Sequence, residues 1–252
     1  HAGMVPYEQG IEPVALMTLA DTAVSVAQTL GPNRYYQLEK LSANEQFGND
    51  HWKVTIDDLI NRRSIKFYQQ PIQPCNNDTE VYRELLARFY NSEGEHLPTT
   101  TVIAMAERYG MSVELDKMIV TQTIKVLSEN PSISGKMGVN ISASSALQDS
   151  FTVWLKDILS KHRGTAARLV FELNESGMQA NLESSHKFVT EIHKVGAKVA
   201  VERFGLGFTS FKFFREVRPD FIKLDSSYSD NIEQDNNNKF FIRMIVDIAK
   251  TR

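Results

Sequence analysis

The most informative stretch of the chain reads Arg168-Leu169-Val170-Phe171-Glu172-Leu173-Asn174-Glu175, a short apolar run that ends in acidic and amide residues and is typical of a buried strand. Similar runs recur, and between them lie amphipathic segments such as 151–159 and 241–248, whose apolar residues repeat at helical spacing. The strand candidates are Ile65–Ile72, Glu80–Phe89, Met137–Ser142, Arg168–Glu175, Lys198–Phe204 and Phe221–Asp225. This alternation predicts an α/β fold with a largely parallel sheet, either open or closed into a barrel.

Polar side chains follow several of these apolar runs at the point where each strand ends. They are Asn140, Glu172, Glu175, Glu202 and Lys223. A single such residue is most simply a strand end that meets solvent, but in a parallel barrel these ends share one rim. Their recurrence therefore favours a common functional site on that rim.

The residue types at this rim indicate a class of chemistry. The set of interest is rich in oxygen and holds one amine: Glu84, Asn140, Glu172, Glu202 and Lys223. Carboxylate and amide oxygens suit hard cations such as Mg²⁺, Ca²⁺ or Mn²⁺. Phosphodiester cleavage typically uses two such ions to position water and to stabilise the leaving oxygen.

The first 50 residues depart from the strand–helix alternation. An apolar stripe from Leu16 to Ala23 predicts a helix that stops near Gly31, and a strand candidate follows at 34–38. Residues 39–50 are polar and indicate a linker. A segment of this size buries too little surface to fold alone.

The totals narrow the class of protein. The chain has 252 residues, a formal net charge of −3 and one cysteine, Cys75. An acidic total disfavours a dedicated nucleic-acid binder, and one cysteine excludes a disulfide framework and a cysteine-rich zinc site. No apolar run approaches the length of a membrane span, and the start has no signal-peptide pattern. The chain begins at His1, which is compatible with a piece of a longer protein.

Six short motifs carry a family resemblance. They are Tyr68-Gln69-Gln70-Pro71-Ile72, Glu84-Leu85-Leu86-Ala87-Arg88, Val139-Asn140-Ile141-Ser142, Phe171-Glu172-Leu173-Asn174-Glu175, Phe204-Gly205-Leu206-Gly207-Phe208 and Ile222-Lys223-Leu224-Asp225. In this order and spacing they resemble EAL domains, which are cyclic-di-GMP phosphodiesterases or inactive relatives of them. The resemblance covers about residues 50–252 and implies an EAL-type (β/α) TIM-like barrel that is incomplete at its C-terminal end.

The segment before these motifs resembles the last helix and strand of a GGDEF domain. It would therefore be a terminal piece of a GGDEF-like α/β domain. The expected organisation has three parts. Residues 1–42 would be the C-terminal remnant of a degenerate GGDEF domain, 43–50 a linker, and 51–252 a degenerate EAL domain that lacks its last strands.

The resemblance implies a role for each matching residue. Gln70 and Arg88 would face the dinucleotide, with Arg88 on a phosphate, and Glu175 would brace the loop after the strand Lys198–Phe204. The remaining roles are metal binding by Glu84, Asn140 and Glu172, and a place beside the attacking water for Lys223.

Two departures from the family pattern point to lost catalysis. Where EAL domains have paired aspartates before Phe-Gly, this chain has Glu202-Arg203, and an arginine offers no lone pair to a metal. A fixed cation a few ångström from a divalent ion costs on the order of 4 kcal/mol at an effective dielectric of 20. Arg203 would instead contact a phosphate or turn out to a surface partner. The second departure is that the last strands of the family, one of which carries a catalytic glutamate, lie beyond Arg252.

We therefore expect no working catalytic or metal site. The vestigial set would be Glu84, Asn140, Glu172, Glu202 and Lys223, and a retained ligand would be bound by Gln70, Arg88, Arg203 and Glu175.

Finer features resemble the CsrD family, also called MshH. Examples are His51-Trp52 and Trp154-Leu155-Lys156-Asp157. That family is implied to be anchored in the bacterial inner membrane, with these domains in the cytoplasm. It is implied to promote decay of CsrB-type small regulatory RNAs with a ribonuclease, and its EAL domain to bind the glucose-specific phosphotransferase IIA protein.

The first hypothesis is therefore a catalytically inactive adaptor without a cofactor, with the IIA protein and a ribonuclease as partners. A homodimer is compatible with it, and direct RNA contact stays open. A second hypothesis is a LapD-like receptor that binds cyclic-di-GMP without cleaving it, supported by Gln70, Arg88 and Glu172. A third is a working phosphodiesterase with Mg²⁺, in which Glu202 would have to replace two aspartates.

The partner surface is sought among the aromatic residues that follow the fifth motif. The candidates for exposure are Phe208, Phe211, Phe213 and Phe214. Phe211 and Phe214 share the i, i+3 spacing of one helix face, so we expect these two in the core.

Overall fold

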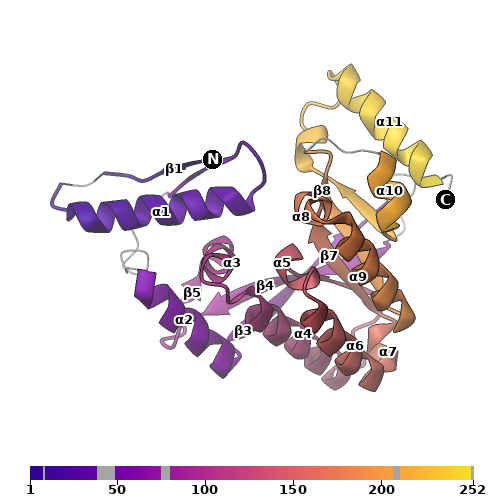
Figure 1. Cartoon of the computed structure of the whole chain (residues 1–252), viewed down its shortest axis with the longest axis horizontal. Helices are drawn as coiled ribbons and strands as arrows, with labels where there is room; N and C mark the ends of the chain where they lie inside the picture. Colours follow the sequence, from indigo (N-terminus) through magenta and orange to yellow (C-terminus); the bar gives the residue numbers. More distant parts are fainter. Residues whose placement is uncertain (8, 39–48, 75–79, 207–210, 251–252) are drawn as a thin grey trace.

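The computed structural model describes residues 1–7, 9–38, 49–74, 80–206 and 211–250, apart from the side chains of residues 49, 50 and 211. Figure 1 shows two parts that differ in size. The N-terminal unit (residues 1–38) consists of β1 (Ala2–Met4), α1 (Pro13–Thr29) and β2 (Tyr35–Gln37). The barrel unit (residues 49–250) holds all the other elements.

The strands of the barrel unit are β3 (Ile65–Ile72), β4 (Tyr82–Tyr90), β5 (His96–Leu97), β6 (Met137–Asn140), β7 (Leu169–Asn174), β8 (Lys198–Phe204) and β9 (Phe221–Leu224). Its helices are α2 (Asn49–Arg62), α3 (Thr99–Arg108), α4 (Ser112–Glu129), α5 (Ala143–Ala146), α6 (Asp149–Lys161), α7 (Arg163–Ala166), α8 (Glu175–Ala180), α9 (Leu182–Lys194), α10 (Phe211–Val217), the short η1 (Ser226–Tyr228) and α11 (Asn236–Lys250).

The barrel unit is built on one sheet with the strand order β3-β4-β6-β7-β8-β9, and β5 pairs with β4. The four pairings from β4 to β9 along this path are parallel, as predicted, but β3 pairs with β4 in the antiparallel direction. The fold is a TIM-like barrel, and within the described residues β3 and β9 form its two edges.

The core lies between the sheet and the helices that follow its strands. In β7 the first five residues are buried, because neighbouring strands cover its edges and side chains pack on both faces. In α6, Phe151, Leu155 and Leu159 are fully buried on one face, which confirms the helical pattern predicted there. In α11 the predicted face also packs on the core, through Ile245 and its apolar neighbours.

The strand predictions are correct at their centres and err at their ends. Ile65–Ile72 and Lys198–Phe204 match β3 and β8 residue for residue. The other four strands differ from their predicted ranges by one or two residues at one or both ends, because the polarity of the sequence does not fix where backbone pairing stops.

The N-terminal unit packs on the barrel unit through its single helix. The predicted helix is present as α1, and Gly31 follows it with a φ of 106°, a left-handed conformation that glycine adopts without strain. β1 and β2 form a two-stranded parallel sheet, and β1 was not among the predicted strands. The other side of α1 packs on α3.

Two sequence predictions need correction here. The expected linker 43–50 overlaps α2, because that helix already begins at Asn49, while residues 43–48 lie outside the described residues. Phe213 is fully buried in α10, not exposed, and Phe214 is buried as predicted. Phe208 and the side chain of Phe211 lie outside the described residues. Among the helices that the structure describes, none is long and apolar enough to span a membrane.

Candidate functional site

The rim of the barrel brings four of the predicted residues into one hydrogen-bonded cluster. Glu84 comes from β4, Asn140 from the end of β6, Glu172 from β7 and Lys223 from β9. The Asn140 side-chain amide donates to Glu84 Oε1 at 2.7 Å, and Lys223 Nζ donates to Glu84 Oε2 at 2.6 Å. Lys223 Nζ also donates to Glu172 Oε2. One ammonium group therefore lies between two carboxylates that come from strands far apart in the sequence.

Glu202 completes the cluster from β8. One carboxylate oxygen each from Glu84, Glu172 and Glu202 lie within 4.8 Å of one another, a grouping that could hold one metal ion. Such an ion would compete with Lys223, whose ammonium already contacts two of these carboxylates. The described rim thus fits a single ion only if Lys223 withdraws, and the chain offers no second acidic residue beside Glu202 for a two-ion centre.

The pKa values in the cluster follow from burial and crowding. Burial raises the pKa of the Glu172 carboxyl to about 7; Lys223 acts against this, and the Glu84 carboxylate adds to it. Burial also raises the pKa of Glu202, against the effect of Lys223 and Arg203. Burial lowers the pKa of Lys223, but Glu172 and Glu84 outweigh it, so the net shift is upward. Burial, more than the crowding of carboxylates, is therefore what makes Glu172 a weaker acid than an exposed glutamate.

Two residues of the rim escaped the sequence analysis, Gly138 and Tyr82. A Cβ built on Gly138 would lie 2.2 Å from Glu172 Oε1 and 2.8 Å from the Tyr82 ring, so only glycine leaves room for this carboxylate. Burial, followed by the charge of Glu172, raises the pKa of the Tyr82 hydroxyl. Glu172 Oε1 and the Tyr82 hydroxyl are buried, and neither has a hydrogen-bond partner within the part of the chain that the structure describes. The signal that could have found Gly138 is a glycine inside an apolar strand, which marks a close approach.

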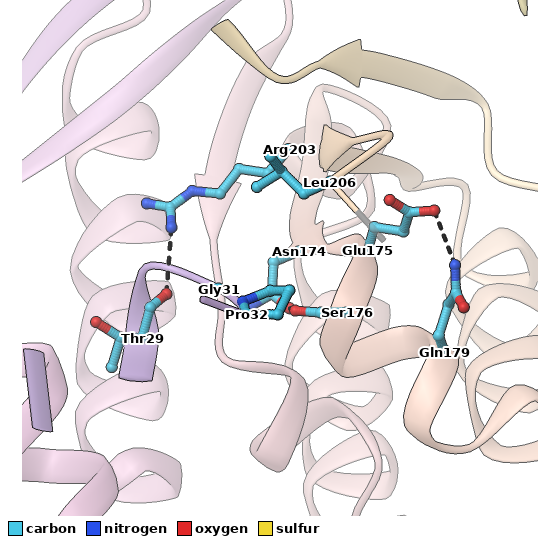
Figure 2. A pocket seen from close by; sticks show the side chains of 9 residues that line it. All are labelled: Thr29, Gly31, Pro32, Asn174, Glu175, Ser176, Gln179, Arg203 and Leu206. Carbon is cyan, nitrogen blue, oxygen red and sulfur yellow. Dashed lines mark hydrogen bonds between the residues drawn. The ribbon is translucent and has the colours of Figure 1, made fainter. Parts of the chain in front are cut away.

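Arg203 points away from the cluster. The pairing of β8 with β9 shifts register between Val201 and Phe204, which is the irregularity of a β-bulge. Arg203 lies within this shift with a φ of 51°, in the left-handed region. Its guanidinium Nη1 donates to the backbone carbonyl of Thr29 in the N-terminal unit at 3.2 Å, as Figure 2 shows. Arg203 was predicted either to contact a phosphate or to turn out to a surface partner. In the structure its side chain lies outside the rim, and it contacts a part of its own chain.

Glu175 supports the turn that follows β8. It is buried at the start of α8, its Oε2 accepts the backbone N–H of Gly205 at 2.7 Å, and its Oε1 accepts the side-chain amide of Gln179 at 2.8 Å. From the other side the Tyr228 hydroxyl donates to the Gly205 carbonyl at 2.6 Å. Gly205 has a φ of 98°. The turn is held at both backbone groups, so Glu175 acts here as a structural brace.

Gln70 and Arg88 lie on the two strands at the β3 edge. Gln70 is exposed and stands opposite Glu84 in the antiparallel register. Arg88 is half-buried, donates to the carbonyl of Ala87 at 2.8 Å, and lies 5.9 Å from the centre of the exposed Tyr68 ring. This edge presents an amide, a guanidinium and an aromatic face, groups that suit a ligand with phosphates and flat bases.

A cavity of about 180 Å³ lies where the N-terminal unit meets the barrel (Figure 2). Thr29, Gly31 and Pro32 line it from one side, and the other side is lined by Asn174, Glu175, Ser176, Gln179, Arg203 and Leu206. The carboxylate cluster does not line this cavity. Arg203 and Glu175 of the expected ligand-binding set thus lie in a different place from Gln70 and Arg88.

Comparison with protein families places most of this chain in one of them. The family described as EAL domain matches residues 53–252. Among curated proteins, the cyclic di-GMP phosphodiesterase PdeA of Borreliella burgdorferi is 28% identical over 190 residues, which are 73% of this chain and 28% of that relative. The RNase E specificity factor CsrD of Escherichia coli is 22% identical over 248 residues, 98% of this chain and 38% of that relative. The chain spans well under half the length of these relatives.

Solved structures share the fold. The S helix-GGDEF-EAL region of Vibrio cholerae LapD bound to c-di-GMP matches with a TM-score of 0.81 at 23% identity, over 94% of this chain and 57% of that one. The same region without ligand has a TM-score of 0.71 over the same shares, also at 23% identity. The EAL domain of Pseudomonas aeruginosa FimX bound to c-di-GMP has a TM-score of 0.71 at 21% identity, over 79% of this chain and 81% of that one.

Proposed function

This chain belongs to the EAL domain family, and we propose that it acts as a regulatory EAL domain that does not hydrolyse a cyclic dinucleotide. The observation that carries this proposal is the charge arrangement of the rim. Lys223 occupies the space between Glu84 and Glu172 that a metal ion would share, and the residue after Glu202 is an arginine. Two-ion hydrolysis needs two clustered cations and their carboxylates, and among the residues that the structure describes this rim lacks the ligands for the second ion.

The regulatory role proposed first is that of a CsrD-type adaptor. Its support is the similarity to the RNase E specificity factor CsrD, which extends over 98% of this chain and includes the N-terminal unit. In this proposal the domain lies in the cytoplasm as part of an inner-membrane-anchored bacterial protein. It would promote turnover of CsrB-type small RNAs by bringing together the glucose-specific phosphotransferase IIA protein and a ribonuclease, with no cofactor.

A second candidate is a receptor that binds cyclic-di-GMP and signals by a change of shape. The exposed Gln70 and the Arg88 guanidinium beside Tyr68 favour it, because together they offer polar and aromatic contacts at the rim. The two candidates differ in whether cyclic-di-GMP binds, and they agree that it is not cleaved.

One experiment tests the shared part of the proposal. The purified chain is incubated with cyclic-di-GMP and Mg²⁺ or Mn²⁺, and the products are separated by chromatography. We expect no linear dinucleotide from the chain, and metal-dependent cleavage would contradict the proposal. Arg203→Asp should raise Mn²⁺ affinity by at least about tenfold, equivalent to 1.4 kcal/mol, because it replaces the positive charge next to Glu202 with a negative one.

Arg218→Asp is the matched control for that variant. Arg218 has a φ of 55°, close to that of Arg203. Its side chain is exposed, and it precedes the start of β9, at the end of the strand opposite to the rim. The same change of charge and backbone strain should leave Mn²⁺ affinity unchanged there. An equal gain in both variants would mean that net charge, not the position beside Glu202, sets metal binding.

Calorimetric titration with cyclic-di-GMP in EDTA separates the two candidates. Heat of binding without cleavage supports the receptor, and Arg88→Ala should then weaken the binding. Absence of binding supports the adaptor, which predicts that the immobilised chain retains the purified IIA protein. Absence of both interactions contradicts both candidates.

A further inference from the structure

The cavity between the N-terminal unit and the barrel unit lies outside the rim and is not used by either candidate function. Its volume is about 180 Å³, below the roughly 300–1,000 Å³ of sites for drug-sized ligands, so it suits a small molecule or ion. The end of α1 and the turn after it line one side, and the other side is lined by the ends of β7 and β8 and by α8 (Figure 2). Each unit therefore supplies one wall.

Arg203 brings a positive charge into this cavity. The side chain is half-buried, and its Nη1 donates to the Thr29 carbonyl, which occupies one of the five N–H groups of the guanidinium. Among the residues that the structure describes, no carboxylate lies within ion-pair distance of Arg203. A guanidinium that has no acidic partner and several spare N–H groups is a strong binding group for an oxyanion.

Asn174 adds a neutral donor from the neighbouring strand. It pairs with Glu202 in the register of β7 and β8, so it stands opposite the position just before Arg203. Its Oδ1 accepts the backbone N–H of Gly177 at 2.7 Å and the Ser176 hydroxyl at 3.1 Å. Because a backbone N–H can only donate, the bond from Gly177 fixes which amide atom is the oxygen. The Nδ2 group has no partner within the described part of the chain, so the cavity has an uncommitted amide donor in addition to the guanidinium.

The other polar groups of the cavity favour a ligand that carries hydroxyl groups. The hydroxyls of Thr29 and Ser176 already donate their hydrogens within the protein, so they can only accept from a ligand. Glu175 is the single acidic residue that lines the cavity among the described residues. Its two oxygens accept from the Gly205 backbone N–H and from the Gln179 amide, so hydrogen bonds already stabilise this negative charge.

We propose that this cavity binds a phosphate group, as inorganic phosphate or as the phosphate of a small hydroxylated metabolite. The Arg203 guanidinium binds two phosphate oxygens through N–H groups that Thr29 does not use, and the Asn174 Nδ2 group donates to a third oxygen. A tetrahedral group suits this arrangement because it can meet donors from two strands at once. The hydroxyls of a metabolite donate to Thr29 and Ser176. The contact between Arg203 and the Thr29 carbonyl persists, so both walls of the cavity stay in place. Cyclic-di-GMP has no part in this site, which is therefore independent of both candidate functions.

Calorimetric titration of the whole chain with inorganic phosphate, and separately with glycerol 3-phosphate, tests this site in a phosphate-free buffer that contains EDTA. We expect saturable binding of both probes. Asn174→Asp retains the oxygen that caps α8 but replaces the Nδ2 donor with negative charge, so it should weaken both affinities at least about tenfold. Asn181→Asp is the matched control, because Asn181 caps α9 in the same way and does not line the cavity. This control should leave both affinities unchanged.

Variants of Arg203 test the role of the positive charge. Arg203→Met removes this charge and should reduce the binding of both probes below detection. Arg203→Lys retains the charge but not the planar fork, so it should bind the probes more weakly than the unaltered chain and more tightly than Arg203→Met. Both variants also alter the contact with Thr29, whereas Asn174→Asp leaves that contact intact. Arg88→Ala, on the strand that pairs with β3, distinguishes the rim from the cavity and should leave the affinity for both probes unchanged.

Each outcome either supports or overturns the cavity as a phosphate site. Tighter binding of glycerol 3-phosphate than of inorganic phosphate would identify a hydroxylated metabolite as the ligand, and equal or weaker binding would identify the free ion; both results support the proposal. Absence of saturable binding would overturn it, as would equal losses of affinity in Asn174→Asp and Asn181→Asp. A loss in Arg88→Ala that Asn174→Asp does not share would place the phosphate at the rim and also overturn it. A chain that fails to bind cyclic-di-GMP but binds phosphate in this pattern would retain the cavity site, so the site and the proposed function are tested separately.

Discussion

At the scale of single residues, Gly138 determines whether the carboxylate of Glu172 can reach the rim. A methyl group on Gly138 would overlap Glu172 Oε1 and the Tyr82 ring. We expect Gly138→Ala to lower the free energy of unfolding by about 1–3 kcal/mol, the usual cost of overpacking a core. Urea denaturation measures this change. Gly164→Ala is the control, because nothing lies within 4 Å of its added Cβ, and a loss of similar size there would contradict the steric explanation.

Asp116 gives the chain a pH-dependent stability that is independent of the rim. Its carboxylate is buried and accepts the backbone N–H of Ser142 at 3.1 Å and the Ser142 hydroxyl. Burial nevertheless raises its pKa from 3.8 to about 6. The folded state therefore prefers the protonated acid, so this stabilising contribution is complete below pH 3.8 and is lost as the pH rises through about 6.

The corresponding variant is Asp116→Asn, which keeps an oxygen for Ser142 but does not ionise. Relative to the unaltered chain it should gain stability from pH 4 to pH 7, by on the order of 3 kcal/mol for a shift of about two units. The difference in urea midpoint between the two proteins, measured across this range, is the readout. A difference that does not change with pH would show that folding does not shift the pKa of Asp116.

Residue types alone indicated which side chains gather at the rim, but not how they satisfy one another. Glu172 and Glu202 were expected together because strand ends meet, Glu84 was grouped with them by residue type, and the three carboxylates do lie together. Lys223 was also expected at this site, but the sequence did not show that its ammonium would lie between two of these carboxylates. The position of the Lys223 ammonium depends on which carboxylates surround it in the folded chain. The spacing of these residues in the sequence does not show this.

At the scale of elements, α10 shows where a periodic pattern is ambiguous. The i, i+3 rule selected Phe211 and Phe214, whereas Phe213 and Phe214 both pack on Phe204 with ring centres 6.2 and 4.9 Å away. Two adjacent buried aromatic residues mean that α10 is covered on two sides, by β8 and by α9. A helix as short as α10 (seven residues) has too few turns for its period to reveal this.

This placement predicts a large difference between two phenylalanines. Phe213→Ala should destabilise the chain by about 3–5 kcal/mol, because it empties a fully buried site. Phe240→Ala on α11 should change stability by less than about 0.5 kcal/mol, because Phe240 is 70% exposed. Chemical denaturation followed by circular dichroism compares the two. Equal losses would place Phe240 in a buried interface of the protein in solution.

Strand direction was the other property of the elements that the sequence left open. β3 has the apolar and aromatic residues of the other strands, and nothing in them distinguishes an antiparallel neighbour from a parallel one. The structure places β3 at an edge of the sheet, where its backbone pairs with a neighbour on one side only. Four consecutive residues of β3, 68–71, are exposed. This mixed polarity in β3, in contrast to the buried run in β7, is the physical trace of an edge strand.

At the scale of the whole molecule, the N-terminal unit is held by the barrel unit and by little else. Its own cluster of buried residues consists of Leu19, Ala23 and Leu38, too few to stabilise a domain. Val26 of α1 belongs instead to the main core. The sequence indicated that this segment is too small to fold alone, but not that α3 would cover it, because that contact joins residues about 80 positions apart.

The dependence of α1 on the barrel predicts two levels of stability within one chain. Amides of α1 should exchange with solvent through a partial opening that costs less free energy than the global unfolding sensed by β7. Val26→Ala removes two buried methyl groups, so it should lower the opening free energy of α1 by about 1.6 kcal/mol, at ~0.8 for each group, and leave β7 unchanged. Val14→Ala alters the same residue type on the same helix, where it is 78% exposed, and should leave both unchanged. Hydrogen exchange followed by mass spectrometry reads α1 and β7 separately. An equal loss of protection in both after Val26→Ala would mean that the two units unfold as one.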